Sequence, residues 1–501
     1  MNSNPMSRRD WIGLAATATF AGLTAGCNDS AQSPDQKKYS PFTGNQKAER
    51  PNIVLFVSDT LRADHLSCYG REPQTSPVID SLAQEGVLFE NCISGSTWTK
   101  PSISTMFTGV PARVHQAVAS KGYINEIVDM QSYRVQVLRE EFLTLAEALK
   151  QLGYSNAYFV GNGHGRPEFG YGRGFDHATF QPDYFVGTQI SDTIDWIWNQ
   201  ASEPFFIVIH QIDPHGPYTP PEANFLDLHG VSMEEASKVM DPDEAAKIQL
   251  FLGMYGKPDT RAGMNNITKE ANDYLKMLYD AEIYSVDMHL NRFINHLKRI
   301  GVFDHTVFAF TSDHGEGFRE HNFYGHSASM AYQELVHVPL VMAGGGLPKG
   351  VRVPHSTSMI DLYPTLLELA GGTSPDYVTG SPMVSRSGDI LVNENRLAYS
   401  DLDYRSEKIE QWDAGIYDGR YKVSSFKRQK KHWIFDRQTD PGELDNLSGS
   451  GKLDEDTERA LIAKLNAEVE RYDTLRQQFG EPAWMEAADG VQEELQALGY
   501  L

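Results

Sequence analysis

Residues 52–57 read Asn-Ile-Val-Leu-Phe-Val, a continuous apolar run that is followed at once by the polar triplet Ser58-Asp59-Thr60. A run without polar alternation is typical of a strand that is buried on both faces of a parallel sheet. Similar apolar runs follow at residues 205–212, 306–311 and 338–342, and helical patterns lie between them, the longest over about 269–300. Strands that alternate with helices indicate an α/β fold with a mostly parallel sheet.

The composition is that of a folded, acidic protein. The chain has 501 residues and a formal net charge of −23, with 40% hydrophobic and 22% charged residues, which excludes wholesale disorder. The net negative charge argues against binding to nucleic acid, because nucleic-acid-binding proteins carry a basic face. An anionic ligand must therefore be bound locally, by a metal ion or by a few well-placed donors. Three cysteines are too few for a disulfide framework.

The first 27 residues resemble a twin-arginine export signal. Arg8 and Arg9 precede an uncharged run over residues 13–26, which is shorter than a membrane-spanning helix requires. Residues 24–27, Thr-Ala-Gly-Cys, resemble a lipobox, so we expect a lipid anchor on Cys27 and a periplasmic or cell-surface location. The alternative is ordinary cleavage nearby, which releases a soluble protein. Residues 28–50 are polar, without an apolar period, and are typical of a flexible linker.

Polar clusters follow the predicted strands. They comprise residues 58–60, 211–215 and 312–316, and a further cluster at 96–102, in which Pro101 suits the first turn of a helix. Open α/β sheets bind ligands beyond the carboxyl ends of their strands. A single aspartate in such a place is commonly a helix cap, and a single Asp-His pair is commonly a surface turn. Together, however, these carboxylates, imidazoles and hydroxyls predict a metal-assisted anion site.

Several segments resemble sulfatases of the alkaline phosphatase superfamily, in the same order along the chain. They are residues 51–59, residues 279–283 with Asp287, and residues 311–316, 337–340, 361–366 and 440–446. The resemblance implies an alkaline-phosphatase-like sandwich, with a large mixed, mostly parallel central sheet flanked by helices. We expect a catalytic domain at 51–385, in which the weaker pattern of residues 222–266 indicates an insertion or lid. From about residue 386 the pattern changes to short strands and glycine turns, which predicts a smaller subdomain with an antiparallel sheet at 386–501.

Two departures from the sulfatase pattern change the expected chemistry. Thr99 stands where sulfatases have the cysteine that becomes formylglycine, and Ile103 stands where the same motif has arginine. Cys92 does not lie in such a motif, so no formylglycine is expected. Thr60 stands where sulfatases have a second aspartate ligand. This pattern resembles the threonine-nucleophile and phosphonate monoesterase branches of the superfamily, which also include nucleotide pyrophosphatases, phosphoethanolamine transferases and lipoteichoic acid synthases.

The resemblance implies one divalent metal ion, held by Asp59, Thr99, Asp313 and His314. Mn²⁺ or Ca²⁺ is favoured by the oxygen-rich ligands, and the imidazole makes Zn²⁺ a third candidate. Thr99 would be a metal-activated nucleophile that forms a covalent phospho-enzyme. The alternative for Thr99 is a helix cap that only orders its loop.

Five further residues are expected around the anion by resemblance. His215 would contact the anion or protonate the leaving group. His326 occupies the place of a lysine that grips the sulfate in sulfatases, and Lys100, which directly follows the nucleophile, would reach the anion. Asn162 and His164 stand near the place of the sulfatase Lys-x-His segment and are candidate substrate contacts. The alternatives are a loop histidine bonded to backbone for His215 and a solvated side chain for Lys100.

The expected function is an exported hydrolase or transferase of phosphate or phosphonate esters, including phosphodiesters. One alternative is a sulfuric ester hydrolase that works without formylglycine. Another is a non-catalytic binding protein on a sulfatase-like scaffold. The expected partner is a small-molecule, glycan or lipid-head-group ester, with the membrane contacted only through the anchor. The sequence leaves the natural substrate and the oligomeric state open.

Overall fold

The computed structural model describes residues 50–118, 120–121, 134–182, 184–200, 204–253, 264, 267–326, 331–402, 412–426 and 430–486. The predicted export signal with Cys27, and the predicted linker up to residue 49, lie outside the described residues. In the described part of the chain, no helix combines the length and hydrophobicity that crossing a membrane requires.

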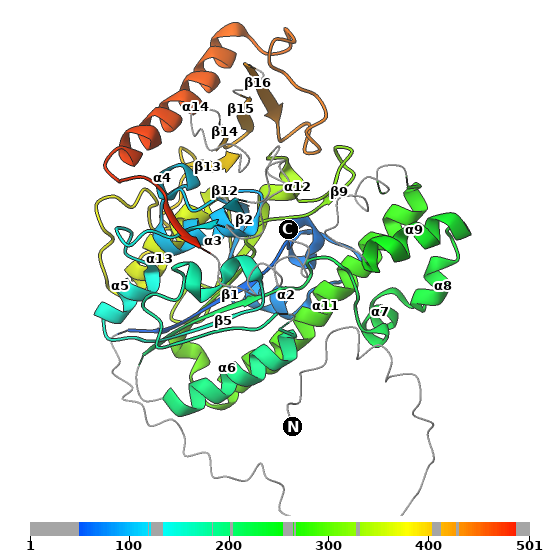
Figure 1. Ribbon diagram of the computed structural model, residues 1–501, viewed down its shortest axis with the longest axis horizontal. Coiled ribbons are helices and arrows are strands. Elements are labelled where there is room, and N and C mark those ends of the chain that lie inside the picture. Colours follow the sequence, from blue (N-terminus) through cyan, green and yellow to red (C-terminus); the bar gives the residue numbers. More distant parts are fainter. Residues whose placement is uncertain are drawn as a thin grey trace, which may run out of the picture.

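An eight-stranded sheet forms the centre of the molecule (Figure 1). Its strands, in spatial order, are β12 (Val351–Ser358), β2 (Gly86–Ile93), β11 (His337–Ala343), β8 (Thr306–Thr311), β1 (Asn52–Ser58), β7 (Phe205–Gln211), β5 (Ser155–Val160) and β6 (His177–Phe180). β11 is antiparallel to both of its neighbours, and the other pairings are parallel. The predicted fold class is therefore confirmed, including the mixed character of the sheet.

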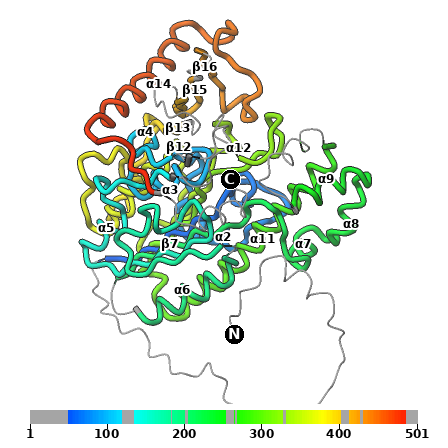
Figure 2. The backbone as a smooth tube through the Cα atoms, in the orientation of Figure 1, coloured from blue at the N-terminus to red at the C-terminus, as the bar shows by residue number. Residues whose placement is uncertain are grey.

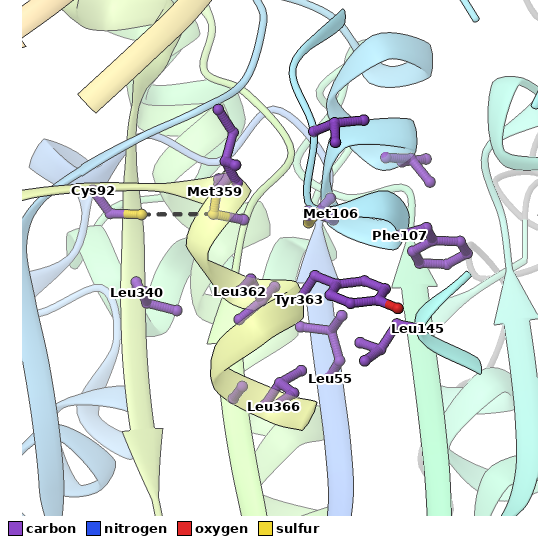
Figure 3. Close-up of a cluster of buried hydrophobic side chains, with 14 of the residues drawn as sticks. Leu55, Cys92, Met106, Phe107, Leu145, Leu340, Met359, Leu362, Tyr363 and Leu366 are labelled. Atoms are coloured by element: carbon purple, nitrogen blue, oxygen red, sulfur yellow. Dashed lines mark hydrogen bonds between the residues drawn. The ribbon is translucent and has the colours of Figure 1, made fainter. Parts of the chain in front are cut away.

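Alternate residues of β1 enter two different hydrophobic cores, because successive side chains of a strand point to opposite faces. Ile53, Leu55 and Val57 belong to the first core, which also receives apolar side chains from α3 (Thr99–Thr108), α5 (Leu145–Gln151) and α13 (Leu362–Leu369). Figure 3 shows part of this core, with Leu55 beside Leu362 and Leu366 of α13. Val54 and Phe56 belong to the second core, with α2 (Pro77–Gln84), α6 (Val186–Gln200) and α11 (Lys269–Arg299).

Two carboxylates of α11, which lie in a sulfatase-like segment, stabilise the fold. Asp287 accepts the backbone N–H groups of Val78 and Ile79, both at 2.9 Å, and so satisfies free donors in the first turn of α2. Asp280 lies 2.6 Å from Nδ1 of His65 and pairs with Arg71 on its other oxygen. These contacts join α11 to the segment that follows β1.

In its described residues, the predicted insertion includes the helices α7 (Glu222–His229), α8 (Met233–Ser237) and α9 (Pro242–Gly253). Phe225 and Phe251 of this insertion are both buried in the second core, where they pack rather than face solvent. Leu226 is 46% exposed. Tyr255 lies outside the described residues.

Smaller elements complete the described structure. They are α4 (Ala112–His115), α12 (Gln333–Val336), the hairpin of β9 (Gly317–Phe318) and β10 (Tyr324–Gly325), and short 3₁₀ turns at Ala63–His65, Ser67–Tyr69, Gly163–Gly165, Pro167–Phe169, Phe303–His305 and Met359–Asp361.

The C-terminal part contains a second, antiparallel sheet of β13 (Leu397–Leu402), β14 (Asp413–Asp418), β15 (Tyr421–Phe426) and β16 (Lys431–Asp436). It is followed by α14 (Glu455–Arg476), which packs on α4 and runs along the top of Figure 2 in orange and red. The last described strand, β17 (Ala483–Glu486), returns to pair with β4 (Arg134–Val137), which also pairs with β3 (Ser120–Lys121).

A buried ion pair joins α4 to the antiparallel sheet. Arg113 is fully buried, and its backbone N–H and its Nε both donate to the carboxylate of Asp401 in β13. Its Nη2 donates to the carbonyl of Trp412 at 3.2 Å. Because both charges are removed from water, each depends on the other for stabilisation.

We expect Arg113→Met to lower the free energy of unfolding by about 3–5 kcal/mol, because the variant leaves the buried Asp401 without its counter-ion. The matched control is Arg352→Met, whose pair with Glu90 is half exposed and should contribute about 1 kcal/mol or less. Urea unfolding of the purified variants measures both changes. Equal losses in the two variants would show that the buried pair does not hold the sheet in place.

Candidate active site

The register of the central sheet brings the predicted metal ligands together. Val57 of β1 is paired with His210 of β7 on one side and with Thr311 of β8 on the other. Asp59 and Asp313 each follow this row by two residues. Because side chains alternate along a strand, His210, Asp59 and Asp313 are all directed to the face of the sheet that α3 covers.

Asp59, His210 and Asp313 form a buried cluster in which one ligand atom of each lies within 4.8 Å of the others. His210 Nε2 is 3.7 Å from Asp59 Oδ2 and 3.8 Å from Asp313 Oδ2, which is too long for a hydrogen bond. Two atoms that each lie about 2.0–2.2 Å from a shared ion are separated by roughly 3–4 Å. His210 Nε2, Asp59 Oδ1 and Asp313 Oδ2 have no hydrogen-bond partner among the described residues. These orphaned buried atoms fit a divalent cation.

His314 adds a second imidazole to this cluster. Its Nε2 lies 3.6 Å from Asp59 Oδ1 and 3.5 Å from Asp313 Oδ2. Its Nδ1 lies 2.9 Å from the carbonyl of Gly315, which can only accept, so Nδ1 carries a proton, and in the neutral imidazole Nε2 then presents a lone pair. The predicted ligands Asp59, Asp313 and His314 therefore lie side by side, and their binding of a metal stays a prediction.

The sequence analysis did not single out His210. A signal was present in β7, Phe-Phe-Ile-Val-Ile-His-Gln, because Phe206, Val208 and His210 share one face of the strand. An imidazole at the end of an otherwise apolar row, beside the strand that Asp59 follows, indicates a polar site on that face.

The carboxylates of Asp59 and Asp313 repel one another in a buried setting. Burial and the neighbouring Asp313 raise the pKa of Asp59 well above its usual value. Burial also acts to raise the pKa of Asp313, but the nearby His314 and His210 hold it below its usual value. Burial lowers the pKa of His210 to about 4, so this imidazole is neutral at neutral pH. A bound cation would allow both carboxylates to be ionised.

The turn after β1 is fixed by contacts with the turn after β8. Thr60 has a φ of +57°, a conformation that is unusual for a β-branched residue. Its N–H lies 3.2 Å from Asp313 Oδ1, and the N–H of Leu61 donates to Ser312 Oγ at 2.8 Å. Thr60 thus contributes a backbone donor to Asp313 at the position where the sulfatase pattern has a second aspartate.

Thr99 is the first residue of α3 and is 1% exposed. Its Oγ1 lies 3.2 Å from His314 Nε2 and 3.3 Å from Asn162 Nδ2. Asn162 Nδ2 also donates to Asp59. The predicted nucleophile and a predicted substrate contact therefore both touch the cluster of candidate metal ligands.

Two more predicted histidines lie against this cluster. The His326 ring centroid is 4.4 Å from that of His314 and 5.0 Å from that of His215. His326 Nδ1 lies 3.2 Å from Glu316 Oε1, which orients the ring. Burial, and then the neighbouring His326, lower the pKa of His215 to about 3, so His215 is neutral at neutral pH.

Lys100 is buried rather than solvated. Its Nζ lies 4.6 Å from the centre of the Phe169 ring and has no hydrogen-bond partner among the described residues. Burial lowers the pKa of Lys100 well below its usual value. Burial and then Lys100 itself lower the pKa of His164, whose ring packs edge-on against Trp98 at 5.4 Å. Lys100 and His164 thus form a buried pair next to the start of α3.

A family model described as Sulfatase matches residues 51–372, and a model described as N-sulphoglucosamine sulphohydrolase, C-terminal, matches residues 319–473. The chain is 24% identical over 495 residues to an N-acetylglucosamine-6-O-sulfatase of Bacteroides thetaiotaomicron, covering 81% of this chain and 84% of that protein.

Two solved structures have a similar fold. The phosphonate monoester hydrolase of Agrobacterium radiobacter has a TM-score of 0.64 and 22% identity, and the match covers 86% of this chain and 96% of that one. A protein solved with its substrate D-glucosamine-2-N,6-O-disulfate has a TM-score of 0.66 and 19% identity, and the match covers 85% of this chain and 98% of that one.

Replacing His210 tests whether it is a metal ligand. We expect His210→Ala to bind Zn²⁺ and Mn²⁺ at least 10²-fold more weakly, a larger loss than the roughly 10–100-fold cost of losing an outer-shell partner. Equilibrium dialysis with elemental analysis measures the affinity. The control is His296→Ala, which removes a buried imidazole of α11 outside the cluster and should leave affinity unchanged. Unchanged affinity in His210→Ala would exclude His210 from the metal site.

Proposed function

The chain belongs to the sulfatase family and is a hydrolase that acts on ester bonds, and from this premise we propose that Thr99 attacks a singly charged phosphorus ester. The observation that carries the proposal is the position of Thr99 Oγ1, within 3.3 Å of both His314 Nε2 and Asn162 Nδ2. A hydroxyl that only capped its helix would be bonded to backbone N–H groups of the first turn. No side-chain cap is formed at the start of α3.

We propose that Asp59, Asp313, His210 and His314 hold one divalent cation. Bound there, the cation would lower the pKa of the Thr99 hydroxyl and neutralise charge on the oxyanion. Two imidazoles beside two carboxylates favour Zn²⁺ or Mn²⁺ over Ca²⁺, which prefers oxygen ligands alone. This preference narrows the expectation from sequence, in which Ca²⁺ was favoured alongside Mn²⁺.

The reaction we propose proceeds in two displacements. Thr99 Oγ loses its proton to solvent and forms a bond to phosphorus, while the bond from phosphorus to the leaving oxygen breaks. The leaving oxygen takes a proton from His326, which Glu316 orients. Water then gives a proton to His326 while its oxygen bonds to the same phosphorus, the bond from phosphorus to Thr99 Oγ breaks, and Thr99 Oγ takes up a proton from solvent. If an alcohol attacks in place of water, the outcome is group transfer.

The charges around the site favour a singly charged substrate group. Asp59 and Asp313 together balance one divalent cation, and the neighbouring His210 and His215 are neutral. Burial also disfavours the charged form of Lys100. Phosphodiesters, phosphonate monoesters and sulfate monoesters carry one negative charge, whereas phosphate monoesters carry nearly two. The names of the similar proteins, a phosphonate monoester hydrolase and sulfatases, are consistent with this choice.

A sulfate ester is the second candidate, and the sulfatase relatives support it. Without formylglycine, a sulfated Thr99 would have to be released by attack of water on sulfur. Phosphorus is the preferred centre because water or an alcohol can resolve a phospho-threonine by the same in-line displacement that formed it.

Replacing Thr99 tests the nucleophile. We expect Thr99→Ala to lower kcat by about 10³-fold or more, because the covalent step is lost. Thr99→Ser keeps an oxygen and should retain part of the activity. The control is Thr108→Ala, whose buried hydroxyl bonds only to the carbonyl of Ser104 in the same helix.

The assay uses bis(4-nitrophenyl) phosphate, 4-nitrophenyl phenylphosphonate, 4-nitrophenyl phosphate and 4-nitrophenyl sulfate, with Zn²⁺, Mn²⁺ and Ca²⁺ supplied separately. Intact mass after rapid quenching detects a phosphorylated Thr99. Undiminished diesterase activity in Thr99→Ala would assign the attack to water. Fastest turnover of 4-nitrophenyl sulfate would favour the sulfatase alternative.

We also propose that the protein is exported and anchored through Cys27, a proposal that rests on the sequence of residues 1–27. A clickable fatty acid should label the wild type and not Cys27→Ala, because the thiol of Cys27 is the acceptor. Equal labelling of both proteins would contradict the anchor, and a processed but unlabelled wild type would indicate a soluble exported protein.

A further inference from the structure

We infer that Asn162 is a catalytic residue whose side-chain amide stabilises the Thr99 oxygen when that oxygen ionises, an inference that rests on the proposed role of Thr99 as nucleophile. This role differs from the substrate contact expected from the sequence. Asn162 is fully buried at the end of β5, two residues beyond the pairing of Val160 with His210.

The orientation of the Asn162 amide is fixed by its neighbours. Its Oδ1 accepts the backbone N–H of His164 at 2.7 Å, and a backbone N–H can only donate. The NH₂ group must therefore be the end that faces Asp59 and Thr99. It has two N–H bonds, one for each of these acceptors, so Asn162 can donate to Thr99 and cannot accept a proton from it.

The other neighbour of the Thr99 hydroxyl is an acceptor. Because His314 Nδ1 donates to the carbonyl of Gly315, its Nε2 presents a lone pair to Thr99 Oγ1 at 3.2 Å. The Thr99 hydroxyl can thus donate to His314 and accept from Asn162. A cation held by His314 Nε2 would replace the first of these bonds and leave the second, so Asn162 is the side chain that still donates to the Thr99 oxygen when its proton is lost.

The Asn162 bond becomes stronger as the reaction begins. A hydrogen bond to an ionised oxygen is roughly twice as strong as one between neutral groups, and the effect is larger where water is excluded. Thr99 and Asn162 are both buried, so little solvent competes. An interaction that strengthens only after ionisation lowers the barrier to attack without changing substrate binding. The amide also adds no charge that would alter the preference for a singly charged substrate.

The test compares Asn162→Ala and Asn162→Asp with the wild type and with Asn156→Ala. Asn162→Asp keeps the shape and the acceptor for His164 but has no N–H bond. Asn156 is the control because it is a fully buried asparagine at the opposite end of β5, and its amide donates to the carbonyls of Ala146 and Gly174. Rapid-quench intact mass gives the rate of Thr99 modification by bis(4-nitrophenyl) phosphate, and equilibrium dialysis gives the bound Zn²⁺.

We expect both Asn162 variants to lower kcat and the rate of Thr99 modification by about 10²-fold or more, the cost of losing one preorganised donor in other enzymes. KM should change by less than about threefold, because binding precedes ionisation. In Asn156→Ala the melting temperature should fall while kcat stays near wild type. Saturating Zn²⁺ should not restore the rate of the Asn162 variants.

Three outcomes would overturn the inference. A kcat within threefold of wild type would show that the amide does not act on the nucleophile. A raised KM with unchanged kcat would return Asn162 to substrate binding. Full recovery at saturating Zn²⁺ would show that Asn162 acts only by holding Asp59. Thr99→Ala is assayed in parallel: if that variant is active, the proposed function fails first, and the role of Asn162 fails with it.

Discussion

The buried pair of Asp59 and Asp313 is the constraint on which the rest of the site depends. Their oxygens face one another in a region from which water is excluded, and two such charges cannot both persist without a compensating cation. The imidazoles of His210 and His314 and the hydroxyl of Thr99 lie around this pair of carboxylates. A protein that only needed to fold would have no reason to place these groups together, since a buried, unpaired carboxylate costs stability.

The sheet explains how one chain brings these groups to one point. β8, β1, β7 and β5 are consecutive parallel neighbours, so Asp313, Asp59, His210 and Asn162 come from four adjacent strands in nearly the same register. α3 then supplies Thr99 from above the sheet. His210 lies within β7, whereas Asp59, Asp313 and Asn162 follow the ends of their strands by one or two residues, so the strand ends set the relative positions of these side chains.

The apolar runs predicted the core strands because burial on both faces leaves no other pattern, as in β1, β7 and β8. β2 and β12 were not predicted, since Glu90 and Asn91 interrupt the first and Pro354 and His355 interrupt the second. His210 was missed because it was read as part of an apolar run. The burial of Lys100 could not be predicted either, because it depends on Phe169, which comes from a turn about 70 residues further along the chain. The sulfatase-like motifs located Thr99, His215 and His326, whose neighbours only the fold reveals.

The pairing of β17 with β4 has a consequence for the order of folding. Ala483 is paired with Val137, so a strand formed early in synthesis waits roughly 350 residues for its neighbour. At about 5–20 residues per second the ribosome needs roughly 20–70 s to supply that partner. Until then the edge of β4 and the α4 surface that later meets α14 are exposed to water and to other chains. The nascent protein therefore passes through a long interval in which chaperones, rather than its own C-terminal segment, must protect its N-terminal half.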